Sequence, residues 1–245
     1  AALIRRFKAF LTPDSAPLVV ASQGAALIGW DEFIPKITQA DVVYVGEAHD
    51  QASHHAVQLE ILKEAHSKHP NLSLGLEMID FTQQKTLDDF LSGAMSEEDF
   101  GKFWNKTAWM LWDLYRPLLR YAKDNHIAVY GLNAPRTIIR QIRIGGLTSL
   151  TLEQRNLLPP RLEPMRDPRY LAFLKKAIAE HGPVDPVQEA HFMEAQMAWN
   201  ETMGHNAVKT IKHGPLLIIA GMGHMFYSAG IAESVRNRSS ARQIV

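Results

Sequence analysis

Short apolar runs recur along the chain, and each one ends abruptly in polar residues and glycine. The runs cover residues 41–45, 72–76, 127–130 and 216–220. Continuous runs of four or five β-rich residues are typical of strands that are buried on both faces, as in a parallel sheet. The pattern therefore predicts parallel strands at these positions.

Apolar residues at helical spacing separate these runs, as the crossover connections of a parallel sheet require. Such spacing covers residues 54–67, 112–125 and 186–212. Pro117 is expected to kink the second helix or to mark the start of its regular part. We therefore predict an α/β fold of three layers, in which helices flank a mainly parallel sheet.

Residues 81–111 and 146–185 do not follow this alternation, and their helical patterns predict a smaller helical subdomain over one end of the sheet. No flexible linker separates them from the rest, so the chain is expected to form one unit. The α/β core would then comprise residues 17–80, 112–145 and 186–245.

Helix-capping signals support the helices of this subdomain. Ser96 is a candidate N-cap followed by acidic residues, and Thr151 opens a capping-box sequence. Asp167 is a natural N-cap, Pro168 suits the first helical position, and Gly182 suits a left-handed residue after the last turn. These signals predict a helix that starts near Asp167 and ends before Gly182.

Side chains capable of acid–base chemistry follow the ends of several predicted strands: Glu47, His49, Glu77 and His224. In open parallel sheets, ligands bind outside the carboxyl ends of the strands, so we expect these side chains to face one crevice. Carboxylates and imidazoles can form general acid–base pairs or ligate a divalent ion such as Zn²⁺. The same residues could instead cap the strands and hydrogen-bond to one another.

Glycines and further histidines flank this cluster. Gly46, Gly221 and Gly223 allow the backbone to turn sharply and to approach a ligand closely. His54 and His55 fall at the start of a predicted helix, where they either reach the crevice or face water. We favour a structural role for these two histidines.

Composition and charge exclude several classes of function. The 245 residues include 26 Lys and Arg and 26 Asp and Glu, and this balance argues against binding nucleic acid through its phosphates. No apolar run approaches the roughly 18–20 residues that cross a bilayer, so no transmembrane segment is expected. Cysteine is absent, which excludes disulfides and thiolate metal sites. The motifs of serine hydrolases, P-loop proteins and dinucleotide-binding proteins are also missing.

An ordered set of short motifs resembles the ChaN-like haem-binding lipoprotein family of bacterial iron uptake. The motifs are Val45-Gly-Glu-Ala-His-Asp50 with His54-His55, Gly75-Leu-Glu-Met78, Gly131-Leu-Asn-Ala-Pro-Arg136, Ala195-Gln196 with Trp199, and Ala220-Gly-Met-Gly-His224. Each motif is weak alone, but their order is specific. The wider superfamily also includes erythromycin esterases, TraB and Tiki proteins, and Tiki proteins are metal-dependent proteases.

The resemblance implies two ferric haems held face to face between two protomers. In that family one tyrosine binds each iron, and a histidine and a lysine of the other protomer hold the propionates. Tyr170 fits the iron ligand best and His181 fits the propionate partner, with Lys175 or Lys176 as the lysine. An outer-membrane haem receptor is a further partner that the resemblance suggests.

The spacing of these residues is compatible with a haem site. Tyr170 and His181 fall on one stripe of the predicted helix, about 16 Å apart at roughly 1.5 Å per residue, which is comparable to the breadth of a porphyrin. A two-fold dimer would supply both haems with both partners. A phenolate suits ferric iron, and Arg166 or Arg169 could stabilise its negative charge.

We therefore expect a haem-binding protein of bacterial iron uptake that holds ferric haem through Tyr170 in a haem-linked homodimer. The alternative is a metal-dependent or general-base hydrolase, similar to a protease or esterase, that uses Glu47, His49, Glu77 and His224. The family is lipid-anchored through a cysteine, which this chain lacks. We expect an outer-membrane lipoprotein or a periplasmic protein of the bacterial cell envelope if the anchor was trimmed, and a cytoplasmic protein otherwise.

Overall fold

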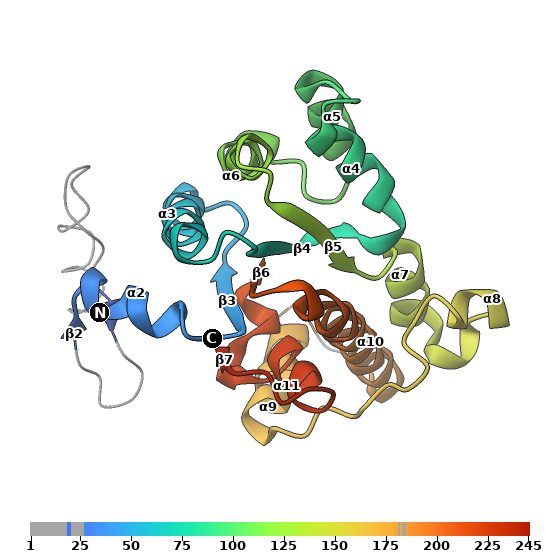
Figure 1. Ribbon diagram of the computed structural model, residues 1–245. Helices are drawn as coiled ribbons and strands as arrows, with labels where there is room; N and C mark the ends of the chain where they lie inside the picture. The colour runs from blue at the N-terminus through green and yellow to red at the C-terminus, as the bar shows by residue number, and fades with distance from the viewer. Residues whose placement is uncertain (1–18, 21–26, 181, 183–184) are drawn as a thin grey trace.

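The computed structural model describes residues 19–20, 27–180, 182 and 185–245. Its centre is a five-stranded sheet in which every neighbouring pair is parallel (Figure 1). In spatial order the strands are β5 (Ala128–Asn133), β4 (Ser73–Asp80), β6 (Leu216–Gly221), β3 (Val42–Glu47) and β7 (Gln243–Ile244). The predicted strands are confirmed, whereas the short edge strand β7 was not predicted. A separate antiparallel pair joins β1 (Val19–Val20) and β2 (Leu27–Ile28).

Helices cover both faces of the sheet (Figure 1). One face carries α3 (Ala52–Lys68), α4 (Gln84–Ser92), α5 (Glu97–Trp104) and α6 (Trp112–Asp124). The other carries α7 (Arg136–Gly145), α9 (Pro168–Ala179), α10 (Pro186–Thr210) and α11 (Ile231–Arg236). The remaining helices are α2 (Trp30–Ile37), α8 (Leu152–Arg155), and the 3₁₀ segments η1 (Phe81–Gln83), η2 (Leu147–Ser149), η3 (Ile211–His213), η4 (Met222–His224) and η5 (Phe226–Ser228). This arrangement confirms the predicted α/β fold.

The helix caps form where the sequence predicts them. The Ser96 hydroxyl accepts a hydrogen bond from a backbone amide of the first turn of α5, and Thr151 opens a complete capping box. Asp167 accepts hydrogen bonds from the backbone amides of Arg169 and Tyr170. These bonds satisfy amides that a helix start leaves unpaired, and they fix where α9 begins.

The segments that were predicted to form one helical subdomain do not share a core. Phe90 and Trp104, from the first segment, are buried in the large hydrophobic cluster beneath α3 and α6. Tyr170 and Leu174, from the second segment, are buried in a separate cluster with Ala229. In the structure α4 and α5 lie on one side of the sheet and α9 on the other, so the two segments pack separately (Figure 1).

The register of the sheet brings the strand ends together. Residue-by-residue pairing of β3 with β6 sets Glu47 opposite Gly221. The strand β4 continues past its predicted end and includes Glu77. Its pairing with β5 shifts register between Leu76 and Asp80. No helix in the described part of the chain has both the length and the apolar character needed to cross a bilayer.

Candidate functional site

The four predicted strand-end residues meet at the carboxyl edge of the sheet. Glu47 ends β3, Glu77 lies in β4, and His224 ends η4 directly after β6. These three side chains are buried, whereas the side chain of His49 is 36% exposed. The four residues thus gather at one edge of the sheet, but only Glu77 lines a cavity in the described part of the chain, and the residues fall into two hydrogen-bonded groups.

The first group surrounds the carboxylate of Glu47. His49 Nδ1 lies 2.7 Å from Glu47 Oε1, and the Gln58 amide donates to Glu47 Oε2 at 2.6 Å. The hydroxyl of Tyr115 also donates to Glu47 Oε1. Sequence reasoning missed Gln58 and Tyr115, because each looks like an ordinary helix residue and only the fold carries it to the strand end.

These contacts set the charge of the first group. Burial raises the pKa of Glu47, but the hydrogen bonds from His49, Tyr115 and Gln58 outweigh it and hold the pKa below its usual value. For His49, burial lowers the pKa, and the hydrogen bond to Glu47 with the nearby charge of Glu77 raises it overall. Glu47 therefore orients the imidazole and favours its protonated form.

His54 and His55 both contact the loop that follows β3, and His55 Nδ1 also lies 3.6 Å from Glu47 Oε2. His54 Nδ1 accepts a hydrogen bond from the backbone amide of Ala48 at 3.0 Å. His55 is buried, and its Nε2 donates to the backbone carbonyl of His49 at 3.0 Å. Both histidines thus fix the loop that presents His49.

The second group is a linear chain of side chains. Glu77 Oε2 accepts from the backbone amide of Gly221 at 2.6 Å, and Glu77 Oε1 lies 3.4 Å from His224 Nε2. His224 Nδ1 contacts Asn200 Oδ1 at 2.7 Å, and the Asn200 amide donates to the Tyr170 hydroxyl at 3.0 Å. Burial would raise the pKa of Glu77, but His224 and the Gly221 amide lower it overall.

Gly221 lies between the two groups, where there is very little space for a side chain. A Cβ atom on Gly221 would lie 2.9 Å from His49 Nε2 and 3.5 Å from Glu77 Oε2. Close approach of the imidazole to the backbone therefore requires glycine here.

The chemistry available to the cluster is acid–base chemistry. Among residues 27–180 and 185–245, no group of three or more potential ligand side chains is arranged to hold a metal ion. The prediction of a divalent-ion site from Glu47, His49, Glu77 and His224 therefore finds no support in the geometry. His49 retains a carboxylate-oriented imidazole whose second nitrogen faces Gly221, which is an arrangement suited to proton transfer.

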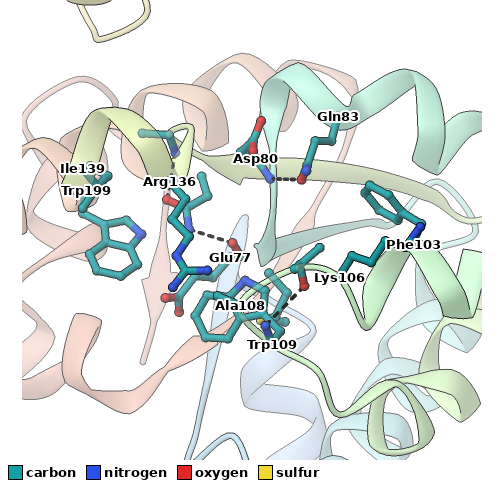
Figure 2. Close-up of a pocket in the computed structure, with 14 residues that line it drawn as sticks. Glu77, Asp80, Gln83, Phe103, Lys106, Ala108, Trp109, Arg136, Ile139 and Trp199 are labelled. Carbon is teal, nitrogen blue, oxygen red and sulfur yellow. Dashed lines mark hydrogen bonds between the residues drawn. The ribbon is translucent and has the colours of Figure 1, made fainter. Parts of the chain in front are cut away.

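A cavity of about 480 Å³ opens beside Glu77, at the ends of β4 and β5 (Figure 2). Its walls include Phe103, Trp109 and Trp199, and its rim carries Lys106 and Arg136. Figure 2 shows Arg136 reaching between Trp199 and the Ala108–Trp109 segment. Sequence reasoning did not identify this cavity, because its lining comes from separate elements.

The structure corrects the sequence-based view of Tyr170. Its side chain has no exposed surface and packs with Leu174, Ala229 and Phe173. Burial also raises its pKa well above the usual tyrosine range, and the hydrogen bond from Asn200 offsets only part of this effect. In this conformation Tyr170 cannot present a phenolate to a haem.

The other predicted haem residues are less constrained. Lys175 pairs with Glu189 at 2.9 Å, and Lys176 is exposed on α9. His181 lies outside the described residues. Arg169 forms an ion pair with Asp167 at 2.6 Å, and Arg166 lies 3.8 Å from Glu163.

Another tyrosine, which sequence reasoning missed, is exposed near α9. Tyr227 in η5 is 49% exposed, and the neighbouring Phe226 is 37% exposed. Phe226 packs edge-on against Phe173 of α9, with ring centres 4.8 Å apart. The guanidinium of Arg169 lies 5.0 Å from the centre of the Tyr227 ring. Together these residues form an aromatic surface with an adjacent cation, which we call the α9–η5 surface.

Comparison with known families and folds agrees with the motifs. The sequence model of the family described as haem-binding uptake, Tiki superfamily, ChaN matches residues 33–235. A curated relative, Protein RETICULATA-RELATED 5, chloroplastic, from Arabidopsis thaliana, is 22% identical over 209 residues, which cover 79% of this chain. The chain spans only 28% of the length of that relative.

Two solved structures share the fold. ChaN of Campylobacter jejuni, in a structure described as showing cofacial haem binding, aligns with a TM-score of 0.77 and 19% identity, covering 95% of this chain and 90% of that chain. The erythromycin esterase EreC, as its H289N mutant in an open conformation, aligns with a TM-score of 0.52 and 12% identity, covering 85% and 70% of the two chains.

Proposed function

This chain belongs to the haem-binding uptake (ChaN) family of the Tiki superfamily, and we propose that it binds ferric haem on the α9–η5 surface. The observation that carries this proposal is the exposed phenol of Tyr227 beside Phe226 and the Arg169 guanidinium. ChaN of Campylobacter jejuni, which has the same fold, is described as binding haem cofacially.

The residues of the α9–η5 surface fit the chemistry of haem. Exposed rings of Phe226 and Tyr227 offer an apolar face to a porphyrin. The phenol oxygen of Tyr227 offers ferric iron a hard anionic ligand once its proton leaves. Arg169 supplies a positive charge that favours such an anion, and Lys176, exposed on the same helix, is available to a propionate.

The backbone at Tyr227 also supports a functional role. Tyr227 has φ of 61° and Ser228 has φ of 53°, a left-handed conformation that is uncommon for residues other than glycine. Such strain persists where surrounding contacts enforce it, and Arg236 donates a hydrogen bond to the Ser228 carbonyl. In this conformation Tyr227 is 49% exposed.

A second copy of the chain is the expected cover for the outer face of the haem. One exposed aromatic surface shields only one side of a porphyrin, and a two-fold dimer would place an identical surface on the other side. The cofacial arrangement named for ChaN of Campylobacter jejuni is consistent with paired chains.

The experiment is a hemin titration followed by absorbance and analytical ultracentrifugation on the wild-type protein, Tyr227→Phe and Tyr170→Phe. We expect a tyrosinate-type high-spin spectrum and a shift toward dimer in the wild type and Tyr170→Phe, and the loss of that spectrum in Tyr227→Phe. Loss of the spectrum in Tyr170→Phe alone would instead identify Tyr170 as the ligand, with α9 rearranged. Retention in both variants would refute tyrosine ligation by either residue.

The hydrolase alternative receives less support. Its metal-dependent form lacks a suitable ligand cluster in the described residues, and its general-base form rests on the Glu47–His49 and Glu77–His224 pairs. The family match points instead to haem binding. Residence at a bacterial cell envelope and delivery through an outer-membrane receptor stay predictions from the sequence.

A further inference from the structure

We propose that the cavity beside Glu77 is a second ligand site, distinct from the α9–η5 surface, and that it takes a small aromatic carboxylate. The cavity lies at the carboxyl ends of β4 and β5, where ligands of open α/β sheets bind (Figure 2). Its volume of about 480 Å³ falls within the range of small-molecule sites in proteins.

The rim of the cavity carries two cations that form no ion pair in the described part of the chain. Arg136 and Lys106 are exposed, and neither forms an ion pair within residues 27–180 and 185–245. Arg136 is the first residue of α7, whose amino end has no side-chain cap and no acidic residue in its first turn. The positive end of the helix dipole thus adds to the two cations. A guanidinium and an ammonium beside a helix start favour a carboxylate group on the ligand.

The walls of the cavity favour an aromatic body on that ligand. Trp109 and Trp199 both line it, and each indole packs on a histidine of the strand-end cluster. The ring centres of Trp109 and His49 are 4.6 Å apart, and those of Trp199 and His224 are 4.9 Å apart. Because these contacts hold the indoles in place, a flat apolar group can stack on them without a large loss of side-chain entropy.

One hydrogen-bond donor of the wall has no partner. The indole Nε1 of Trp199 is buried, and nothing in the described structure accepts from it. A buried donor without an acceptor is costly, and Figure 2 shows this nitrogen on the side of the ring that faces Arg136. Because this nitrogen has essentially no exposed surface, it does not add a donor to the cavity, and the proposal rests on the rim cations and the indole faces.

The lining also includes two carboxylates, Glu77 and Asp80, and both are hydrogen-bonded within the protein. The carboxylate of Glu77 is already bound by the Gly221 amide and faces His224. Asp80 accepts a hydrogen bond from the backbone amide of Thr82 at the start of η1. The carboxylate oxygens are therefore held by protein donors and point to fixed partners, whereas the rim cations form no ion pair in the described residues and are left to meet the carboxylate of a ligand.

The test is isothermal titration of the full chain with benzoate, phenylacetate and 3-phenylpropanoate, each compared with its uncharged amide. We expect at least one acid to bind. Its amide should bind with an affinity at least about tenfold lower, because a charge-assisted hydrogen bond is lost. Arg136→Gln and Lys106→Gln should each lower the affinity for that acid by about tenfold. The matched control is Arg140→Gln, one turn along α7 and outside the cavity lining, which should leave the affinity unchanged.

Other results overturn the proposal. Binding of none of the three acids, or equal binding of acid and amide, would refute a carboxylate site. The same variants are also titrated with hemin, whose propionates and flat macrocycle share this chemistry. If Arg136→Gln and Lys106→Gln weaken hemin binding, the cavity belongs to the haem site and the proposal of a separate ligand site is wrong. Unchanged hemin binding keeps the two proposals independent.

Discussion

The side-chain amide of Asn200 donates a hydrogen bond of 3.0 Å to the hydroxyl of Tyr170 in the protein interior. Through Asn200 the same chain of contacts continues to His224 and then to Glu77. The tyrosine that the sequence suggested for haem and the acid–base cluster that it suggested for catalysis are therefore parts of one buried network. Both the oxygen and the nitrogen of the Asn200 side chain are used within it, so removing His224 leaves the oxygen unpaired and removing the Tyr170 hydroxyl leaves the nitrogen only the weak acceptor Met165 Sδ.

We predict that Tyr170→Phe destabilises the protein without removing haem binding. The substitution keeps the ring but leaves the Asn200 amide only the weak sulfur acceptor of Met165, at 3.8 Å, at a cost of about 1–3 kcal/mol. Tyr227→Phe, at an exposed position, should change the free energy of unfolding by less than about 0.5 kcal/mol. Urea unfolding of both variants measures this difference, and equal stability of the two would contradict the buried hydrogen bond.

The sequence predicts the fold well because buried parallel strands and helix caps are local signals. Strand ends such as Glu47 and Glu77 could also be predicted, since a parallel sheet brings its carboxyl ends to one edge. The partners of these residues could not. Tyr115 and Asn200 lie on helices whose rotation about their own axes depends on packing. The burial of Tyr170 and the exposure of Tyr227 likewise depend on the contact of α9 with η5, which no local pattern encodes.

We predict that the pKa values of His49 and His205 are shifted in opposite directions from that of an ordinary histidine. The pKa of His49 is lowered by burial but raised overall by Glu47 and Glu77. The pKa of His205 is lowered by burial and by the charges of Lys209 and Arg238. NMR titration of the imidazole signals should therefore give a pKa above about 6.5 for His49 and a pKa below about 6.5 for His205.

Glu47→Gln provides the control for His49. Loss of the carboxylate should lower the pKa of His49 and leave the pKa of His205 unchanged. Because the folded-state pKa of His49 lies above its unfolded value, its contribution to stability is present in full below about pH 6.5 and is lost as the pH rises through the folded-state value. A pKa of His49 that does not respond to Glu47→Gln would contradict the proposed orientation.

Acid should destabilise the protein through Glu47 and Glu77. Both carboxylates are buried, yet hydrogen bonds hold their pKa values below the usual value. Their contribution to stability is therefore present above about pH 4.3 and is lost as the pH falls through the folded-state pKa values. Glu47→Gln and Glu77→Gln should lower stability at pH 7 and flatten its decline in acid, as measured by urea unfolding across pH 3–7. Curves parallel to the wild type would show that these groups do not carry the acid response.

Gly221→Ala should displace His49. A Cβ atom here would lie 2.9 Å from His49 Nε2, which is closer than ordinary contact, and overpacking of this kind costs about 1–3 kcal/mol. Gly223→Ala is the matched control, because its Cβ would meet only Phe173 at 3.9 Å. Thermal unfolding and the NMR signal of His49 report the effect. An unshifted His49 signal in Gly221→Ala would mean that the imidazole has room that the structure does not show.

Arg169→Gln should weaken hemin binding severalfold, with Arg166→Gln as its control. Arg169 lies 5.0 Å from the Tyr227 ring, and its ion pair with Asp167, whose pKa falls to about 2, fixes its position at the start of α9. Removing this cation takes away a charge that stabilises an iron-bound phenolate and an aromatic contact worth about 0.5–1 kcal/mol at exposed sites. Arg166 is exposed on the same segment and does not contact the Tyr227 ring. Hemin titrations of the two variants test the assignment: equal weakening would indicate a general effect of positive charge, and it would remove the argument that Arg169 acts through Tyr227.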